Sequence, residues 1–123
     1  MQIIKGIRHA TSDLVLLCKL SLKDLAPGGS GISSIMQVAK ILKKEGIELF
    51  HVTEGLIIGN PLRRHTSLDK TAPDASFAED AQIFRNELQH PVILSGRVTT
   101  PQVAEFRISK SFCDMVSLGR TLN

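Results

Sequence analysis

The sequence predicts an α/β fold in which parallel strands alternate with helices. Short apolar stretches of strand length alternate along the chain with segments whose apolar residues recur at helical spacing. Loops rich in glycine and proline separate these segments. Because 42% of the 123 residues are hydrophobic and 22% are charged, the chain also has enough apolar surface for a packed core.

Hydropathy argues against a membrane protein. The longest apolar run, Leu14–Cys18, is far shorter than the roughly 20 residues that a membrane-spanning helix needs. The first ten residues, MQIIKGIRHA, mix apolar and basic positions and lack the apolar block of a signal peptide. We therefore expect a soluble, cytoplasmic protein with no membrane partner.

Charge and aromatic content argue against a nucleic-acid partner. The net charge is only +3, and the basic residues are scattered along the chain. The five aromatic residues are all Phe, which leaves little to stack on bases. Cys18 and Cys113 do not form a metal-binding pair, and the four histidines share no ligand spacing, so no metal site is predicted.

The first half of the chain predicts a helix, a strand and a second helix. Residues 2–10 place three isoleucines on one helical face. Leu14–Leu20 is apolar apart from one lysine, which is typical of a strand buried on both faces. After a loop rich in glycine, Ser33 or Ser34 is expected to cap a helix that Gly46 ends.

The second half repeats this alternation. Thr99 or Thr100 is expected to cap a helix that begins with Pro101. The unusually long connection before the third helix is typical of a functional loop. The expected segments are a strand over Ile47–Thr53, a loop over Glu54–Ala75, a helix over Ser76–Leu88, a strand over Pro91–Leu94, the helix after Thr100, and a strand over Met115–Leu118.

Two Gly-Arg pairs follow the last two predicted strands. Gly96 precedes Arg97, and Gly119 precedes Arg120. A glycine at a strand end lets the backbone approach a ligand closely, and an arginine binds phosphate through two parallel hydrogen bonds. Paired sites of this kind resemble the phosphate cradle that barrels build from their last two βα loops. The alternative is that the glycines serve turns and the arginines are solvated.

Two further residues at strand ends are candidates for a site. Lys19 is a cation within an apolar run, where it either neutralises negative charge on a bound cofactor or extends its ammonium to solvent. Cys18 lies on the opposite face of the same strand. His51 lies in a strand of alternating type and is more typical of a hydrogen-bonded core residue than of a catalyst.

Four motifs follow one another along the sequence and cover nearly the whole chain. They are LLCKLSLKDLAPGG, VAKILKKEGIELFHVTEG, HPVILSGRVTTPQVAEF and CDMVSLGRTL. In order and spacing they resemble segments of the old yellow enzyme family, the FMN-dependent NADH:flavin oxidoreductases that include 2,4-dienoyl-CoA reductase.

The resemblance implies a fold and a cofactor. The chain would be the C-terminal half of a (β/α)8 TIM barrel, with residues 1–123 forming strands five to eight of an FMN-binding domain. Lys19 matches a position, usually Arg in the family, that contacts the N1/O2 edge of the flavin. The family's FMN-phosphate positions match Gly96, Arg97, Gly119 and Arg120.

The resemblance also implies an activity that this chain would share with other residues. The family transfers hydride from NAD(P)H through FMN to an electron-poor alkene, such as an enone or enoyl substrate. Its acid–base residues belong to the first four strands, so no catalytic residue is assigned in this chain, which would be a fragment or one half of a split enzyme. The alternative is a non-catalytic half barrel that binds FMN or another phosphate ligand and pairs with another chain. In either case, self-association or a partner chain completing the barrel is expected. A phosphate-binding α/β domain outside the family is the third possibility.

Overall fold

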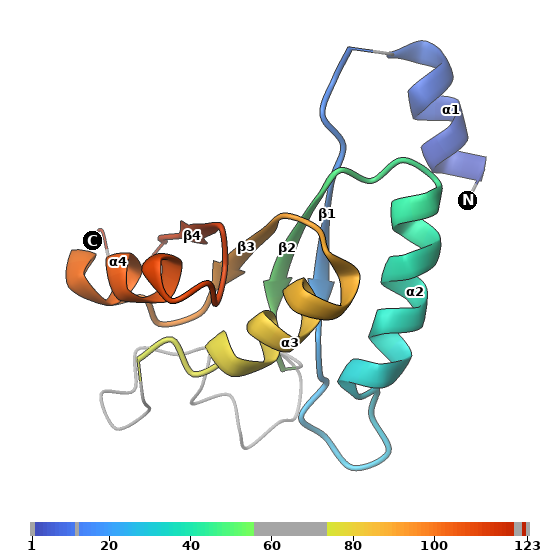
Figure 1. Ribbon diagram of the computed structural model, residues 1–123. Helices are drawn as coiled ribbons and strands as arrows, with labels where there is room; N and C mark the ends of the chain where they lie inside the picture. Colours follow the sequence, from blue (N-terminus) through green and yellow to red (C-terminus); the bar gives the residue numbers. More distant parts are fainter. Residues whose placement is uncertain (1, 12, 56–73, 120–121, 123) are drawn as a thin grey trace.

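The computed structural model describes residues 2–11, 13–55, 74–119 and 122, and in these ranges four strands alternate with four helices (Figure 1). The eight elements occur in the predicted order. They are α1 (Gln2–Ala10), β1 (Leu17–Ser21), α2 (Ile32–Lys44), β2 (Leu49–Thr53), α3 (Ala78–Leu88), β3 (Val92–Ser95), α4 (Pro101–Ser109) and β4 (Met115–Ser117).

The four strands form one parallel sheet, as the alternation of strands and helices predicts. Their order in the sheet, β1-β2-β3-β4, is their order in the chain. Each strand pairs in parallel with the next, so a helix must return the chain across the sheet between successive strands. All carboxyl ends of the strands therefore lie at one edge of the sheet.

The prediction that the first strand is buried on both faces is wrong. The strand begins at Leu17, and Leu14 and Val15 precede it with 59% and 68% of their surface exposed. Leu17 itself is 47% exposed, and Lys19 is also exposed. The reason is that helices pack against only one face of the sheet, so the alternate residues of β1 on the other face are not covered.

The two predicted helix caps have different outcomes. α4 begins as expected, since the Oγ1 atom of Thr100 accepts a hydrogen bond from the backbone N–H of Val103 at 3.2 Å and Pro101 occupies the first turn. α2 instead starts after Gly31, whose backbone is extended and whose carbonyl accepts from the N–H of Ser34. Ser33 and Ser34 therefore lie within the first turn and are not the cap.

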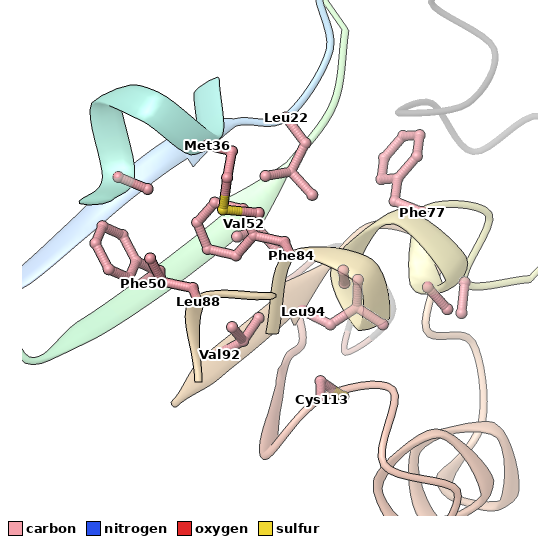
Figure 2. Packing of buried hydrophobic residues seen from close by; sticks show 14 of the residues in the cluster. Leu22, Met36, Phe50, Val52, Phe77, Phe84, Leu88, Val92, Leu94 and Cys113 are labelled. Carbon is pink, nitrogen blue, oxygen red and sulfur yellow. The ribbon is translucent and has the colours of Figure 1, made fainter. Parts of the chain in front are cut away.

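The core lies between the sheet and helices α2 and α3 (Figure 2). Phe50 and Val52 of β2 are fully buried. The ring of Phe50 packs edge to face against that of Phe84 of α3, with the ring centroids 5.5 Å apart. Val92 and Leu94 of β3 continue the same buried face. Because these residues alternate along their strands, the residues between them belong to the other face of the sheet.

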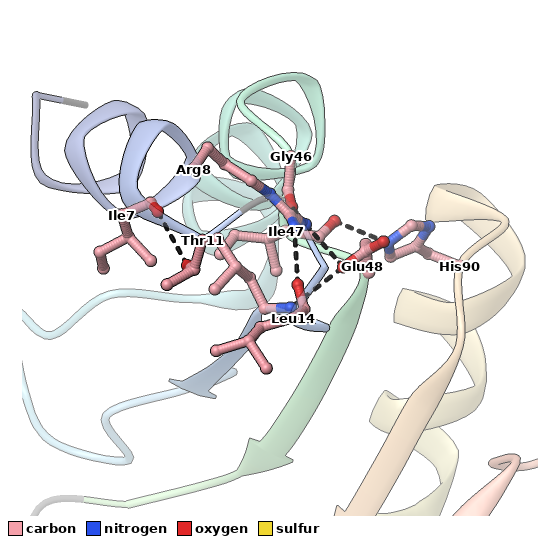
Figure 3. A network of polar contacts seen from close by, with 9 residues as sticks. Ile7, Arg8, Thr11, Leu14, Gly46, Ile47, Glu48 and His90 are labelled. Carbon is pink, nitrogen blue, oxygen red and sulfur yellow. Dashed lines mark hydrogen bonds and ion pairs between the residues drawn. The ribbon is translucent and has the colours of Figure 1, made fainter.

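A polar network holds α1 to the amino-terminal side of the sheet (Figure 3). The guanidinium of Arg8 donates to the carbonyl oxygens of Leu14 at 2.7 Å and Gly46 at 2.6 Å. It also pairs with Glu48 at 2.6 Å, whose carboxylate accepts from the N–H of Leu16 at 3.0 Å. Arg8 thus joins the first helix to the starts of the first two strands.

The second face of the sheet is less covered, and we call it the open face. None of its side chains is fully buried. A barrel turns such a face inward, where branched apolar residues fill its interior. The open face consists of Leu17, Lys19, Ser21, Leu49, His51, Thr53, Ile93, Ser95, Met115 and Ser117.

Within the described ranges, every helix is too short or too polar to span a bilayer.

Candidate functional site

The sheet register places Lys19 and His51 side by side on the open face. The Cα atoms of these two residues are paired across β1 and β2, and His51 is paired in turn with Ile93 of β3. Neighbouring strands lie about 4.7–4.9 Å apart, so the two side chains start close together on the same face. The sequence predicted each residue as a separate candidate, and the fold brings them together.

The two residues influence each other electrostatically. Burial of the His51 ring lowers the pKa of its imidazole, and the positive charge of Lys19 lowers it further. His51 is half-buried as a residue, but its Nε2 atom is inaccessible to solvent and no described residue forms a hydrogen bond with it. The expectation of a hydrogen-bonded core histidine is therefore not met at this nitrogen. Among the described residues, Lys19 has no carboxylate within ion-pair distance.

A row of hydroxyl groups follows toward the carboxyl ends of the strands. Ser21 is paired with Thr53, and Ser95 is paired with Ser117. The hydroxyl of Ser21 donates to the carbonyl of Lys23 at 3.0 Å, and that of Ser95 donates to the carbonyl of Val52 at 3.2 Å. Two of these hydroxyls thereby satisfy backbone carbonyls, and their oxygens remain capable of accepting a hydrogen bond from a ligand.

Gly96 is required by the packing of the chain itself. Its backbone has a φ of +129°, and a Cβ atom there would lie 2.6 Å from the Cδ2 atom of Phe77. Phe77 is almost fully buried immediately before α3. The side of Gly96 that lacks a side chain therefore faces this ring, so packing already accounts for the glycine that the sequence assigned to phosphate binding.

The arginine after Gly96 is engaged within the protein. A guanidinium nitrogen of Arg97 lies 3.7 Å from a carboxylate oxygen of Asp74, and the carbonyl of Arg97 accepts from the N–H of Ala75 at 2.9 Å. At the next strand end, a Cβ on Gly119 would meet open space. Arg120 lies outside the described residues, as does most of the predicted loop Glu54–Ala75.

An acidic pair, one member of which is buried, lies with a lysine close to the same edge of the sheet. Glu54 follows β2 and is only 4% exposed, Asp80 belongs to the first turn of α3, and Lys23 follows β1. Lys23 forms an ion pair with Asp80. Burial, together with the hydrogen bond and charge of Asp80, raises the pKa of Glu54 to about 8. Burial acts to raise the pKa of Asp80 too, but hydrogen bonds from Glu54 and Lys23 lower it.

Sequence reasoning missed this cluster, although one signal was present. Glu54 continues the alternation of Phe50 and Val52, and so it falls on the helix-facing side of the strand. An acidic residue at an apolar position of this kind indicates a buried, paired carboxyl group. Within the described ranges, no three histidine, cysteine or acidic side chains form a group that could hold a metal ion.

Comparison with curated proteins finds reductases and an oxidase. The chain is 29% identical over 126 residues to a bilirubin reductase of Mediterraneibacter gnavus. It is 27% identical over 123 residues to an NADH oxidase of Thermoanaerobacter brockii, and 21% identical over 123 residues to a metal reductase of Desulforamulus reducens. Each alignment covers 99% of this chain but only 18–20% of the relative. The chain thus spans about a fifth of the length of these relatives.

Comparison with solved structures finds the same architecture. A 2-naphthoyl-CoA reductase, solved in complex with 2-naphthoyl-CoA, matches 94% of this chain with a TM-score of 0.82 and 24% identity. The match covers 17% of that reductase, so the four parallel strands and their helices correspond to part of a larger reductase barrel. No family model matches the chain. The relatives are reductases and an NADH oxidase, which agrees with the resemblance of the four ordered motifs to the old yellow enzyme family.

Proposed function

We propose that this chain forms half of an FMN-dependent NAD(P)H reductase barrel of the ene-reductase type. Its relatives are NAD(P)H oxidoreductases of the old yellow enzyme type, which supports the coarse reaction class. The observation that carries the proposal is the row formed by Lys19 and His51 on the open face. Among the described residues, Lys19 has no carboxylate partner and the Nε2 atom of His51 has no hydrogen-bond partner.

The residues of the open face are suited to bind a flavin ring. Lys19 would neutralise negative charge at one edge of the ring, although a lysine lacks the two-pronged hydrogen bonding of an arginine. The row of hydroxyl groups, which lies toward the carboxyl ends of the strands, would offer acceptors to the polar groups of the ring. Gly119 and Arg120 would hold the phosphate, and Arg97 would contribute by sharing its guanidinium between Asp74 and the phosphate.

Bound FMN would supply hydride transfer between NAD(P)H and an electron-poor alkene such as an enone or enoyl substrate. The described residues contribute binding and charge to this chemistry. The open face holds no acidic side chain and no tyrosine, since the sequence has no Tyr. His51 matches a position that the family does not use for proton transfer, so proton donation to such a substrate would depend on groups from the other half of a barrel.

Titration of the purified chain with FMN, followed by flavin fluorescence, tests the proposal. We expect saturable binding that becomes about tenfold weaker in Lys19→Gln, because one charge-assisted contact is lost. Arg97→Ala and Arg120→Ala are expected to weaken binding as well. The matched control is Lys40→Gln, which removes an exposed lysine from α2, on the covered side of the sheet.

Two results would contradict this proposal. The first is the absence of saturable binding by a folded chain. The second is an equal weakening of FMN binding by Lys19→Gln and Lys40→Gln. Both variants lower the net charge by one, but only Lys19→Gln changes the open face, so equal weakening would be an effect of net charge alone.

A second candidate function is supported by the edges of the sheet. Among the described strands, β1 and β4 each have one unpaired side, and the open face between them includes Leu17 and Met115, which are 47% and 42% exposed. Exposed strand edges and apolar surface favour association. We therefore propose that a second copy of this chain or a partner chain supplies the remaining strands of the barrel. Unless that partner also supplies catalytic groups, the chain acts as a non-catalytic half barrel that binds FMN.

A further inference from the structure

His51 lies where an electrostatic change at Lys19 alters its proton affinity. Its register partner on β1 is Lys19, and its partner on β3 is Ile93, which carries no charge. Leu49 and Thr53, its neighbours on the same face of β2, do not titrate in the ordinary pH range. Among the described residues of the open face, Lys19 is therefore the charged group that His51 meets.

Both influences on His51 favour its neutral form while the face holds no ligand. Partial burial removes water from the ring, and the neighbouring ammonium repels a second positive charge. An anion beside Lys19 would offset the charge of Lys19. Rotation of the imidazole would let its Nε2 atom, which is buried and has no hydrogen-bond partner among the described residues, donate to that anion. Anion binding and protonation of His51 should then strengthen each other, because linkage is reciprocal.

We propose that His51 is a second anion-binding residue of the open face, which takes up a proton when a flavin ring beside Lys19 becomes anionic. The inference rests on the proposed function, and it deepens that function by naming what His51 does. Two-electron reduction with uptake of one proton adds one negative charge to a flavin ring. The further proton, taken from solvent by the imidazole, balances that charge within the site.

Proton NMR titration of the histidine rings tests this inference on the whole chain. His51→Gln identifies the His51 signals among the four histidines. Spectra are recorded for the chain alone, with FMN, and with FMN reduced by dithionite. We expect reduced FMN to increase the proton affinity of His51 at least about tenfold, or one pKa unit, over that in the free chain. Oxidised FMN, whose ring is neutral, should produce a smaller increase.

The coupling to Lys19 has its own readout in the free chain. Lys19→Gln should raise the pKa of His51, since the repelling charge is removed, whereas Lys40→Gln should leave it unchanged. The signals of His90 provide an internal reference, because this ring contacts the carbonyl of Ile47 at the opposite end of the sheet. Dithionite without FMN shows whether the reductant itself changes the spectra.

The outcomes separate this inference from the proposed function. If reduced FMN binds saturably and the His51 titration does not move, the inference is wrong and the proposed function stands. If neither form of FMN binds to the folded chain, both are wrong. If FMN binds and all four histidines shift together, the change is a general electrostatic one, and the specific role of His51 is overturned.

Discussion

Gly96 holds a position that a larger residue could not occupy without displacing the ring of Phe77. The Cβ of any other residue would lie 2.6 Å and 2.7 Å from two ring carbons, on a backbone whose φ of +129° already disfavours a side chain. Gly119, by contrast, has open space around its missing Cβ. Both glycines precede an arginine in the sequence, but packing excludes a side chain only at Gly96.

This difference predicts that the same substitution has a large effect at Gly96 and almost none at Gly119. Gly96→Ala should lower the free energy of unfolding by about 2 kcal/mol or more, through backbone strain and overpacking against Phe77. Gly119→Ala should change it by less than about 0.5 kcal/mol, as is usual for an exposed position. Urea denaturation of both variants measures the contrast. Equal losses would show that packing against Phe77 is not what requires Gly96.

Single residues also show where sequence patterns lose information. The alternation of β2 correctly separates Phe50 and Val52 from His51, because side chains of a strand point to alternate faces. The same pattern does not reveal that Arg97 lies beside Asp74, or that Lys19 and His51 share a register. Those pairings depend on how separate segments align in space, which the local sequence does not specify.

At the scale of elements, the acidic pair joins three segments that are distant in the chain. Glu54 at the end of β2 contacts Asp80 in the first turn of α3, and Asp80 is paired with Lys23 after β1. Backbone bonds reinforce this junction, since the N–H of Gly55 donates to the carbonyl of Lys23 at 2.8 Å. Below its pKa the Glu54 carboxyl is protonated and donates to Asp80, so one proton is shared by a buried and a partly buried carboxyl group.

The raised pKa of Glu54 predicts that alkaline pH destabilises the fold. The folded-state value of about 8 exceeds the ordinary value of 4.5, so the folded chain binds more protons between these two pH values. Stability from this group is therefore complete below about pH 4.5, falls as pH rises, and is lost above about pH 8. The slope approaches about 1.4 kcal/mol per pH unit within this window.

Glu54→Gln isolates this contribution, because the amide can still donate to Asp80 and does not ionise. Thermal unfolding between pH 6 and pH 8 should show a falling Tm in the wild-type chain and a flatter profile in Glu54→Gln. Glu87→Gln, which changes an exposed carboxylate on α3, should retain the wild-type slope. Parallel profiles for all three proteins would contradict the assignment of the slope to Glu54.

Element boundaries were predicted best where a side chain determines them. Thr100 and Pro101 mark the start of α4 through a capping hydroxyl and a fixed φ angle, and the structure confirms both. The start of α2 is set by the backbone of Gly31, so the serines that follow gave a misleading signal. β1 begins three residues after the start of the apolar run, because the register with β2 begins at the pair of Leu17 and Leu49.

At the scale of the whole molecule, the described sheet has helices on one face and an open second face. Parallel sheets usually have both faces covered, either by helices or by closing into a barrel. The fold agrees with part of a larger reductase barrel at a TM-score of 0.82. The sequence motifs predicted this relationship, while the exposure of the open face follows only from the packing of helices on the other side.

An open face of this kind predicts that the chain associates with itself when no other strands are supplied. β4 of one copy can lie beside β1 of another, and two copies related by a twofold axis would bring together eight parallel strands, the number in a closed (β/α)8 barrel. Association would then bury the exposed apolar surface of Leu17 and Met115. Lys19 and its symmetry mate would lie within the same interior, so bound anions should strengthen the dimer.

Analytical ultracentrifugation over a concentration series tests this expectation. The wild-type chain should sediment as a dimer, and FMN should shift the equilibrium further in that direction. Leu17→Glu combined with Met115→Glu should yield monomers, because association would have to bury two additional carboxylates from each copy. Ile83→Glu alters a side chain of similar exposure, 46%, on α3 of the covered side and should leave the dimer intact. A wild-type chain that is monomeric at every concentration would show that the open face does not drive self-association, and strands to complete a barrel would then have to come from a different chain or from additional sequence.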